Sequence, residues 1–429
     1  MSLIFILLGT FFLLAFLGVP IAISLGVASG IGMLTAGVSV SGIAQRMFAG
    51  VDSFSYLAIP MFMLAGKLME YGGISARIVQ VAKILCAKVR GGLAITSIVA
   101  CSFFAALSGS APATVSAIGG IMYPEMLKDG YDEEFAGGMI SVAGNLGPLI
   151  PPSILMVTIG VCTGVSISDM FLGGIVIGIL LAAVFCLTAY VICRRRNYGG
   201  SGQTYSSKEK WRIFWSAMPA LGMPIIILGG IYSGLFTPTE AAAIAVFYGI
   251  IVSAFVYRNM GMKDFLHVLS ASASSTASIL FLVANAHIFS YLLSSEQIPQ
   301  KLAILMTSLT TNPTIIMFLI MIVLLIAGCF LDNAVAVILL TPIFVNVVQA
   351  MNIDICYFGV FLVFVLAIGQ VTPPVGLCLF VACDIGKVSI EKVSREVLPY
   401  VGGLIVTAIL LVLFPPEIGT WLPSLTKMA

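Results

Sequence analysis

The sequence predicts a polytopic, all-α membrane protein, and three observations lead to this fold class. Hydrophobic residues make up 60% of the chain and charged residues only 9%, a composition far from that of soluble domains. Apolar runs long enough to cross a bilayer recur from end to end, for example at residues 3–17, 170–193 and 398–414. Series of short alternating strands, the pattern of a membrane β-barrel, are absent. At roughly twenty residues a pass, the length allows about ten to twelve passes and leaves no folded soluble domain.

The basic residues predict how the chain is oriented. All but three of the 20 lysines and arginines fall in segments that can all lie on the same side of the membrane. The exceptions are Arg46, Lys301 and Lys427. The positive-inside rule places that face in the cytoplasm, which puts both termini on the periplasmic side. The segments 91–127 and 313–350 must then be re-entrant hairpins. If either segment crossed the membrane completely, the basic segment 194–196 or the basic segment 387–395 would lie on the periplasmic side.

The two halves of the chain repeat each other. A shift of 222 positions places Gly147 on Gly369, the prolines at 151–152 on those at 373–374, and Ser110 on Asp332. The first hairpin opens to the cytoplasm and the second to the outside, so the repeat is inverted. Inverted repeats with broken helices are the architecture of secondary transporters.

Each repeat is expected to contain scaffold helices, an amphipathic arm, a hairpin and a broken helix. In the first repeat, residues 1–205, these are the arm 74–90, the hairpin 91–127 and the broken helix 132–166. In the second repeat, residues 206–429, they are the arm 296–310, the hairpin 313–350 and the broken helix 354–386.

The proline pairs break their helices where no water is expected. In "GNLGPLIPPS" (144–153), each proline lacks an amide and leaves a carbonyl without its donor. Such backbone is tolerated inside a membrane only where protein, water or an ion satisfies it. Carbonyl oxygens suit a hard cation such as Na⁺. A simple proline kink is the alternative, but two breaks at matched positions, each with a polar hairpin tip, favour a site.

We therefore predict two Na⁺ sites related by the repeat. The first combines the tip of one hairpin with the break in 144–153, through Ser108, Gly109, Ser110, Gly144, Asn145, Gly147 and Pro148. The second combines the other hairpin and break, through Gly328, Asp332, Asn333, Gly369, Val371 and Thr372. Asp332 is the only carboxylate deep in an apolar hairpin, where a charge costs several kcal/mol unless it faces a partner or cavity. Its alternative role is to cap the second hairpin helix.

Six motifs give the chain a resemblance to a known family. They are "LAIPMFMLAGKLM" (57–69), "RGGLAITSIVACSFFAALSGSAPAT" (90–114), "NLGPLIPPS" (145–153), "GLFTPTEAAA" (234–243), "GCFLDNAVAVILLTPI" (328–343) and "GQVTPPVG" (369–376). With these motifs the chain resembles, over essentially its whole length, the large membrane subunit of a tripartite ATP-independent periplasmic (TRAP) transporter.

The resemblance implies an elevator-type carrier of the bacterial inner membrane, with a fold like that of the ion transporter superfamily, driven by a Na⁺ gradient. It implies two partners: a small four-helix membrane subunit, expected here as a separate polypeptide, and a periplasmic substrate-binding protein. The implied substrate is an organic acid. The chain looks closest to sialic acid carriers, although C4-dicarboxylate carriers share every motif.

The substrate is expected to bind at the same tips and breaks as the cations. The expected contacts are Ser110, Thr114, Asn145, Pro152, Asp332, Asn333 and Thr372. Neither tip carries an arginine that could clamp a carboxylate, so helix N-termini and backbone amides would have to bind the anion.

Three other functions compete with this one. An ion channel would need a symmetric pore, whereas two unlike hairpin tips favour an occluded carrier site. A membrane-embedded enzyme lacks support, because no nucleophile triad, HExxH motif or carboxylate pair lies near a break. A stand-alone carboxylate carrier coupled to Na⁺ or H⁺, without a binding protein, stays open. The net charge of +2 does not suggest nucleic-acid binding.

Overall fold

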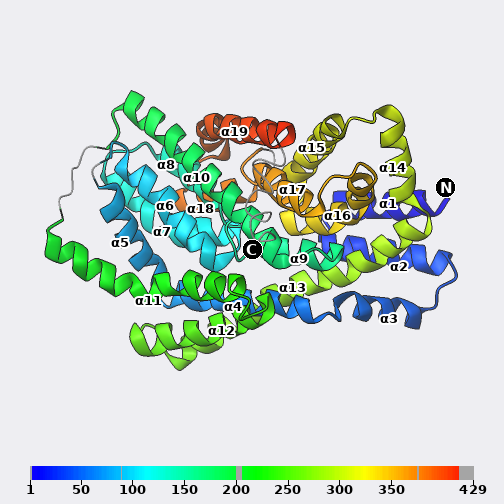
Figure 1. Cartoon of the computed structure of the whole chain (residues 1–429), viewed down its shortest axis with the longest axis horizontal. Helices are drawn as coiled ribbons and strands as arrows, with labels where there is room; N and C mark the ends of the chain where they lie inside the picture. The colour runs from blue at the N-terminus through cyan, green and yellow to red at the C-terminus, as the bar shows by residue number, and fades with distance from the viewer. Residues whose placement is uncertain (1, 88, 200–204, 374–375, 415–429) are drawn as a thin grey trace.

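Helices are the regular elements of the described structure. The computed structural model describes residues 2–87, 89–199, 205–373 and 376–414, and every regular element in these ranges is a helix (Figure 1). This agrees with the predicted all-helical class. The helices form two groups that lie side by side, with two short arms across their ends.

The first group, called the flank group here, draws helices from both halves of the chain. It consists of α1 (Ser2–Phe16), α2 (Ile21–Thr35), α3 (Val40–Val51), α4 (Ala58–Tyr71), α11 (Ser207–Tyr232), α12 (Pro238–Ile250) and α13 (Met262–Ser295). The long helix α13 packs along α2, α3 and α4, and α12 packs against α4 and α11. Helices of the second half therefore hold those of the first half together.

The second group, called the site group, contains the hairpins and broken helices. It consists of α6 (Gly92–Ser108), α7 (Ala111–Lys128), α8 (Glu133–Gly144), α9 (Ile154–Thr163), α10 (Ile167–Arg196), α15 (Pro313–Phe330), α16 (Asn333–Ala350), α17 (Ile355–Gly369), α18 (Leu377–Gly386) and α19 (Ile390–Leu413). Helix α8 packs against α6, α7 and α18, while α17 packs against α15 and α16. Every residue from Cys356 to Gly369 is buried, as expected of a helix that is apolar on all sides.

The two predicted arms are short separate helices. They are α5 (Ile74–Cys86) and α14 (Ile298–Leu309), and each runs across the long helices at an opposite end of the molecule (Figure 1). Helix α5 contacts α6 and α11, and α14 contacts α16 and α13. Each arm therefore touches both helix groups. Lys88, within the first predicted arm, lies outside the described residues.

Fewer helices span the membrane than the chain length allows. Among the described residues, seven helices are long and apolar enough to cross, or eight if the pair Val40–Val51 and Phe54–Tyr71, bent by 67°, counts as one span. The ten to twelve passes that the chain length allows are thus more than the helices that reach spanning length. Much of the apolar sequence lies in helices of 10–17 residues, because prolines and glycines interrupt it.

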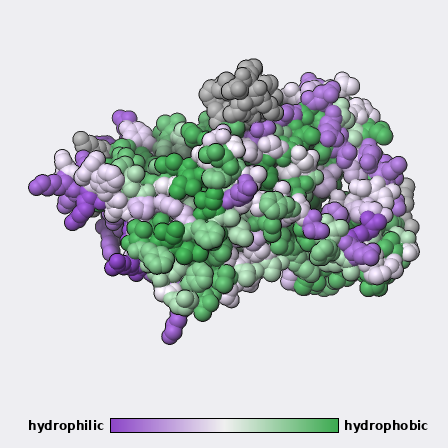
Figure 2. Space-filling view, turned by 60° about the horizontal axis from the view of Figure 1, so that its bottom comes forward, coloured by the Kyte–Doolittle hydropathy of each residue, from purple (hydrophilic) through white to green (hydrophobic). Residues whose placement is uncertain are grey.

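Apolar side chains cover the middle of the visible face, while polar ones gather at its left tip and towards the right (Figure 2). This is the pattern expected of a protein whose middle contacts lipid.

The helix starts follow local signals. Thr237 and Glu240 form a capping box with Pro238 in the first turn of α12, and Ser206 and Glu209 form one at the start of α11.

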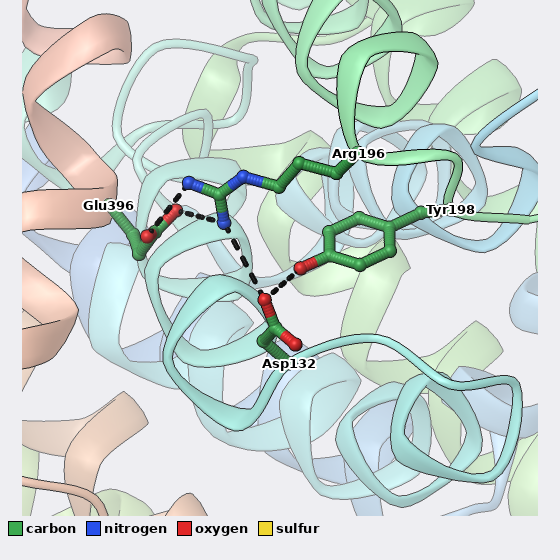
Figure 3. A network of polar contacts seen from close by, with 4 residues as sticks. All are labelled: Asp132, Arg196, Tyr198 and Glu396. Carbon is green, nitrogen blue, oxygen red and sulfur yellow. Dashed lines mark hydrogen bonds and ion pairs between the residues drawn. The ribbon is translucent and has the colours of Figure 1, made fainter.

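An ionic network joins three helices of the site group at the end that carries α5. Arg196, the last residue of α10, donates a hydrogen bond to Glu396 of α19 at 3.0 Å and forms an ion pair with it at 2.9 Å (Figure 3). Tyr198 donates to Asp132, which precedes α8 and lies 3.8 Å from Arg196. Burial raises the pKa of Tyr198, so its hydroxyl stays protonated and keeps donating. The network fixes α8, which leads directly into the first break.

Candidate functional site

The tip of the first hairpin is a tight turn with a hydroxyl cluster. Gly109 ends α6 with a φ of +60°, a conformation that glycine adopts without strain. Thr114 donates to the carbonyl of Ser110 at 2.8 Å and lies 2.9 Å from the Ser108 hydroxyl. The Ser110 side chain forms no cap bond to α7. The tip therefore presents hydroxyl and carbonyl oxygens on one short turn.

The first break leaves backbone carbonyls without helical partners. Prolines at 148, 151 and 152 provide no amide, so the carbonyls four residues earlier lose their usual donors. Gly147 donates to Gly144 at 2.9 Å and closes one of these gaps. Among the described residues, no backbone amide donates to the carbonyls of Gly147 or Pro148. Except for the half-buried Ile150, residues 145–153 are buried, so these oxygens lie in the protein interior.

Asn145 stands out within this break. Its side chain is 0% exposed, and neither its amide nitrogen nor its amide oxygen has a hydrogen-bond partner among the described residues. Leaving buried polar groups unpaired costs about 1–3 kcal/mol each. An orphaned amide next to freed carbonyls marks a position where a ligand could bind.

The first break lies directly on the first hairpin tip. A Cβ at Gly147 would lie 2.5 Å from the carbonyl oxygen of Ser110, and one at Gly109 would lie 2.5 Å from that of Pro152. Real Cβ contacts are essentially never this short. The two glycines therefore permit a backbone-to-backbone approach that other residues would block. The structure brings together the residues that the sequence assigned to the first cation site.

The second hairpin carries a carboxylate at its turn. Asp332 Oδ1 accepts a hydrogen bond from the amide of Ala334 at 2.8 Å and so caps α16. The alternative capping role considered from the sequence is therefore present. Next to it, Asn333 is 2% exposed, and both polar atoms of its amide lack partners among the described residues. Each half of the chain thus places one orphaned asparagine at its site.

The second break also packs against its own hairpin. A Cβ at Gly369 would lie 2.5 Å from the Cα of Gly328, so the predicted pair meets backbone to backbone. Thr372 donates to the carbonyl of Ile368 at 2.7 Å, and Val371 is fully buried. Pro373 is exposed, while Pro374 lies outside the described residues. The second break is therefore more open than the first.

Two helix N-termini without side-chain caps point to an anion-binding capacity. Neither Ser110, before α7, nor Gly376, before α18, provides a side-chain bond to its helix. Helices α7 and α18 pack together. Cys378, in the first turn of α18, lies close to Cys101 in α6 and to Asp332. The start of α18 therefore lies near both hairpins. The Cys378 amide is bonded to the carbonyl of Gln370, and the other amides of this turn suit a negatively charged group.

Two residues at the site were not predicted from the sequence. Ser153 is fully buried and caps α9 by accepting a hydrogen bond from Met156. Its position between a proline pair and an apolar run is a helix-start signal that could have revealed it. Gln370 is 5% exposed and accepts from both the amide and the thiol of Cys378. No local pattern indicates this bond, because it closes a loop across the break.

The donor atoms of the site are carbonyl, hydroxyl and amide oxygens with one carboxylate. Among the described residues, no group of three or more His, Cys, Asp and Glu side chains could hold a metal ion. A set of neutral oxygens with a single carboxylate suits Na⁺ better than a transition metal. The residues present therefore fit the predicted cation.

Comparison with known proteins identifies the family. The model of the family "Tripartite ATP-independent periplasmic transporter, DctM component" matches residues 8–418. A C4-dicarboxylate TRAP transporter large permease protein of Vibrio cholerae is 39% identical, over 95% of this chain and 94% of that protein. The sialic acid TRAP transporter large permease protein of the same organism is 35% identical, over 94% of each chain.

Two further similarities concern a longer relative and a solved structure. An isethionate TRAP transporter permease protein of Oleidesulfovibrio alaskensis is 39% identical over 96% of this chain, which spans only 65% of that protein. The crystal structure of the YdaH transporter of Alcanivorax borkumensis aligns with a TM-score of 0.64 and 14% identity, over 87% of this chain and 88% of that one. This second similarity indicates a shared fold.

Proposed function

The chain belongs to the DctM family of tripartite ATP-independent periplasmic transporters, and on this premise we propose that it imports an organic acid by coupling it to a Na⁺ gradient. The relatives are permease components, which confirms both the family that the sequence resembles and the prediction that the chain is not an enzyme. We place the protein in the bacterial inner membrane. Its proposed partners are a separate small membrane subunit and a periplasmic protein that delivers the substrate.

One observation carries the proposal of Na⁺ coupling. In both halves, a glycine of the break packs against the backbone of the hairpin, Gly147 on Ser110 and Gly369 on Gly328. In both halves a buried asparagine beside this contact lacks hydrogen-bond partners among the described residues. A bound Na⁺ would satisfy these oxygens, because hard cations take carbonyl and amide oxygens as ligands.

The proposed cation ligands are those expected from the sequence. Near the first contact they are oxygens of Ser108, Gly109, Ser110, Gly144, Asn145, Gly147 and Pro148. Near the second contact they are oxygens of Gly328, Asp332, Asn333, Gly369, Val371 and Thr372. Of these, Asp332 supplies the charge that would attract the cation most strongly.

The substrate class follows from the relatives and from the helix ends. The named relatives carry C4-dicarboxylate, sialic acid or isethionate, all of which are organic anions. The uncapped starts of α7 and α18 offer amides to such an anion, with Thr114 and Pro152 close by in the first hairpin and break. The polar contacts proposed for it are Ser110, Asn145, Asp332, Asn333 and Thr372.

The arrangement of the groups suggests how transport proceeds. The site lies wholly within the site group, and each arm joins that group to the flank group. We propose that the site group moves as an elevator against the flank group. We also propose that the two halves, divided at 205/206, are inverted copies with both termini periplasmic. Of the second half, 415–429 lies outside the described residues.

Uptake into proteoliposomes tests the proposal. The chain, its small subunit and the binding protein would be reconstituted and supplied with radiolabelled succinate, sialic acid or isethionate. We expect one of these acids to accumulate only with an inward Na⁺ gradient and the binding protein, and uptake to saturate. Uptake without the binding protein would support a stand-alone carrier, and gradient-independent, non-saturating flux would support a channel. Either result would overturn the proposal.

A further inference from the structure

A groove lies between the arm α5 and the first turns of α11. It encloses about 300 Å³. Its apolar walls are Ile84 and Leu85 from α5 together with Trp211 and Phe214 from α11. Of the described residues that line it, Lys210 alone is charged. The two helices pack together, and the groove lies along their contact.

Aromatic residues gather on the same turns of α11. Trp211, Phe214 and Trp215 form a cluster whose ring centroids lie 5.6–6.4 Å apart. The Trp211 side chain is 63% exposed. Tryptophan concentrates at the level of lipid headgroups, because its ring is apolar and its N–H is polar. The cluster therefore indicates that this end of α11 lies at the membrane interface.

Two lysines at this end have no ion pair within the described chain. Lys208, Lys210 and Arg212 lie in the first two turns of α11, and neither lysine forms an ion pair with a described residue. The acidic neighbour Glu209 is turned back to the cap, where it accepts a hydrogen bond from the Ser206 amide at 2.8 Å. The arm's own Lys83 is paired with Glu125 of α7. The groove thus combines apolar walls with lysines free to meet an external anion.

We propose that this groove binds an anionic phospholipid from the cytoplasmic leaflet. Its phosphodiester would accept hydrogen bonds from Lys210, and an acyl chain would lie along Leu85, Trp211 and Phe214. Basic pockets at the cytoplasmic ends of membrane helices attract anionic headgroups, and the apolar walls favour the chain. The lipid would fill the space between the arm and α11, and so brace the arm against the flank group.

Tryptophan fluorescence provides a direct test, because the chain contains only 3 tryptophans. Replacing two of them (W215F and W421F) in the full chain leaves Trp211 as the only one. The protein would be placed in phosphatidylcholine vesicles that contain a minor fraction of brominated phosphatidylglycerol or brominated phosphatidylcholine. Bromine quenches fluorescence only on contact, so the quenching measures how strongly each lipid occupies the groove.

We expect the brominated anionic lipid to quench Trp211 more strongly at equal concentration. Lys210→Gln should lower the preference for the anionic lipid about fivefold, the value expected for one lysine near a membrane surface. Lys210→Arg should keep it, and the matched control Lys263→Gln, an exposed lysine at the start of α13, should leave it unchanged. Added salt should reduce it.

Three results would overturn the proposal. Equal quenching by the two lipids would show that the groove does not select charge. No quenching by either lipid would show that something other than lipid covers Trp211, such as a protein partner. Loss of the preference in Lys210→Arg as well as Lys210→Gln would show that the charge of residue 210 does not determine binding. Circular dichroism of each variant shows whether the helices are intact.

Discussion

The two halves of the molecule build the same contact with different chemistry. In the first half, the hairpin tip carries only hydroxyl groups, from Ser108, Ser110 and Thr114, and the break beside it is buried. In the second half, the tip carries the carboxylate of Asp332, and the break has an exposed proline at 373. The same backbone contact is therefore surrounded by neutral groups and enclosed in the first half, and is charged and more open in the second half.

This difference predicts unequal contributions to cation binding. Two charges attract far more strongly in a low-dielectric interior than in water, and a carboxylate adds this attraction where a hydroxyl adds only a dipole. The second site is then expected to bind Na⁺ more tightly, and the first to depend on geometry. The following substitutions test that comparison, from the largest expected effect to the smallest.

Removing the carboxylate of Asp332 should have the largest effect. Asp332→Asn keeps a good helix cap but loses the charge, so we expect normal insertion and no Na⁺-driven uptake. Asp332→Ala should also lose uptake and, in addition, about 1 kcal/mol of stability through the lost cap. Proteoliposome uptake and thermal unfolding in detergent measure the two effects separately. If Asp332→Ala transported with an unchanged Na⁺ dependence, the carboxylate would serve only as a helix cap.

Alanine at either contact glycine should be the next most damaging change. In Gly147→Ala and Gly369→Ala the new methyl group meets backbone atoms of the hairpin, which cannot turn aside as a flexible side chain can. We expect a loss of about 1–3 kcal/mol in each case and weaker Na⁺ binding. Gly120→Ala is the control, because open space surrounds that position in α7, and alanine favours a helix there. Equal unfolding temperatures for the Gly120, Gly147 and Gly369 variants would contradict the close contacts.

Replacing the orphaned asparagine of the first site should separate stability from function. In Asn145→Leu, an apolar side chain of similar size replaces two unpaired polar atoms, which should raise stability without Na⁺ by about 1 kcal/mol. The same variant should lose the stabilisation that Na⁺ gives the parent protein. Unfolding temperatures with Na⁺ and with K⁺ measure both quantities. If Na⁺ still stabilised the variant as much as the parent protein, Asn145 would not be a ligand of the cation.

The smallest effect is expected at Ser110, the repeat counterpart of Asp332. Ser110→Ala removes one neutral oxygen, so the loss should be on the order of 1 kcal/mol. We expect transport to continue with a raised Na⁺ requirement, measured as the Na⁺ concentration that gives half-maximal uptake. If Ser110→Ala abolished uptake as Asp332→Asn should, the two sites would be of equal weight, and the comparison of charge would be wrong.

The sequence by itself determined where the helices break. Gly109, the prolines at 148, 151 and 152, and the cap at Asp332 act on their own neighbours in the chain, through missing amides, a positive φ and local hydrogen bonds. The observed helices therefore begin and end close to the residues expected for the arms, hairpins and breaks, while the orientation of these segments in the membrane stays a prediction. The family could also be identified from the sequence, because its motifs lie in these same local segments.

The sequence paired each hairpin tip with a break, but only the tertiary structure decided how closely their backbones approach. The contacts of Gly147 with Ser110 and of Gly369 with Gly328 join segments about 40 residues apart, and the pair of Arg196 and Glu396 joins helices 200 residues apart. Such contacts depend on how whole helices pack, so no local pattern specifies them. The unpaired state of Asn145 and Asn333 was hidden for the same reason. Burial and the absence of a partner are properties of the surroundings, and the chain acquires them only when its helices come together.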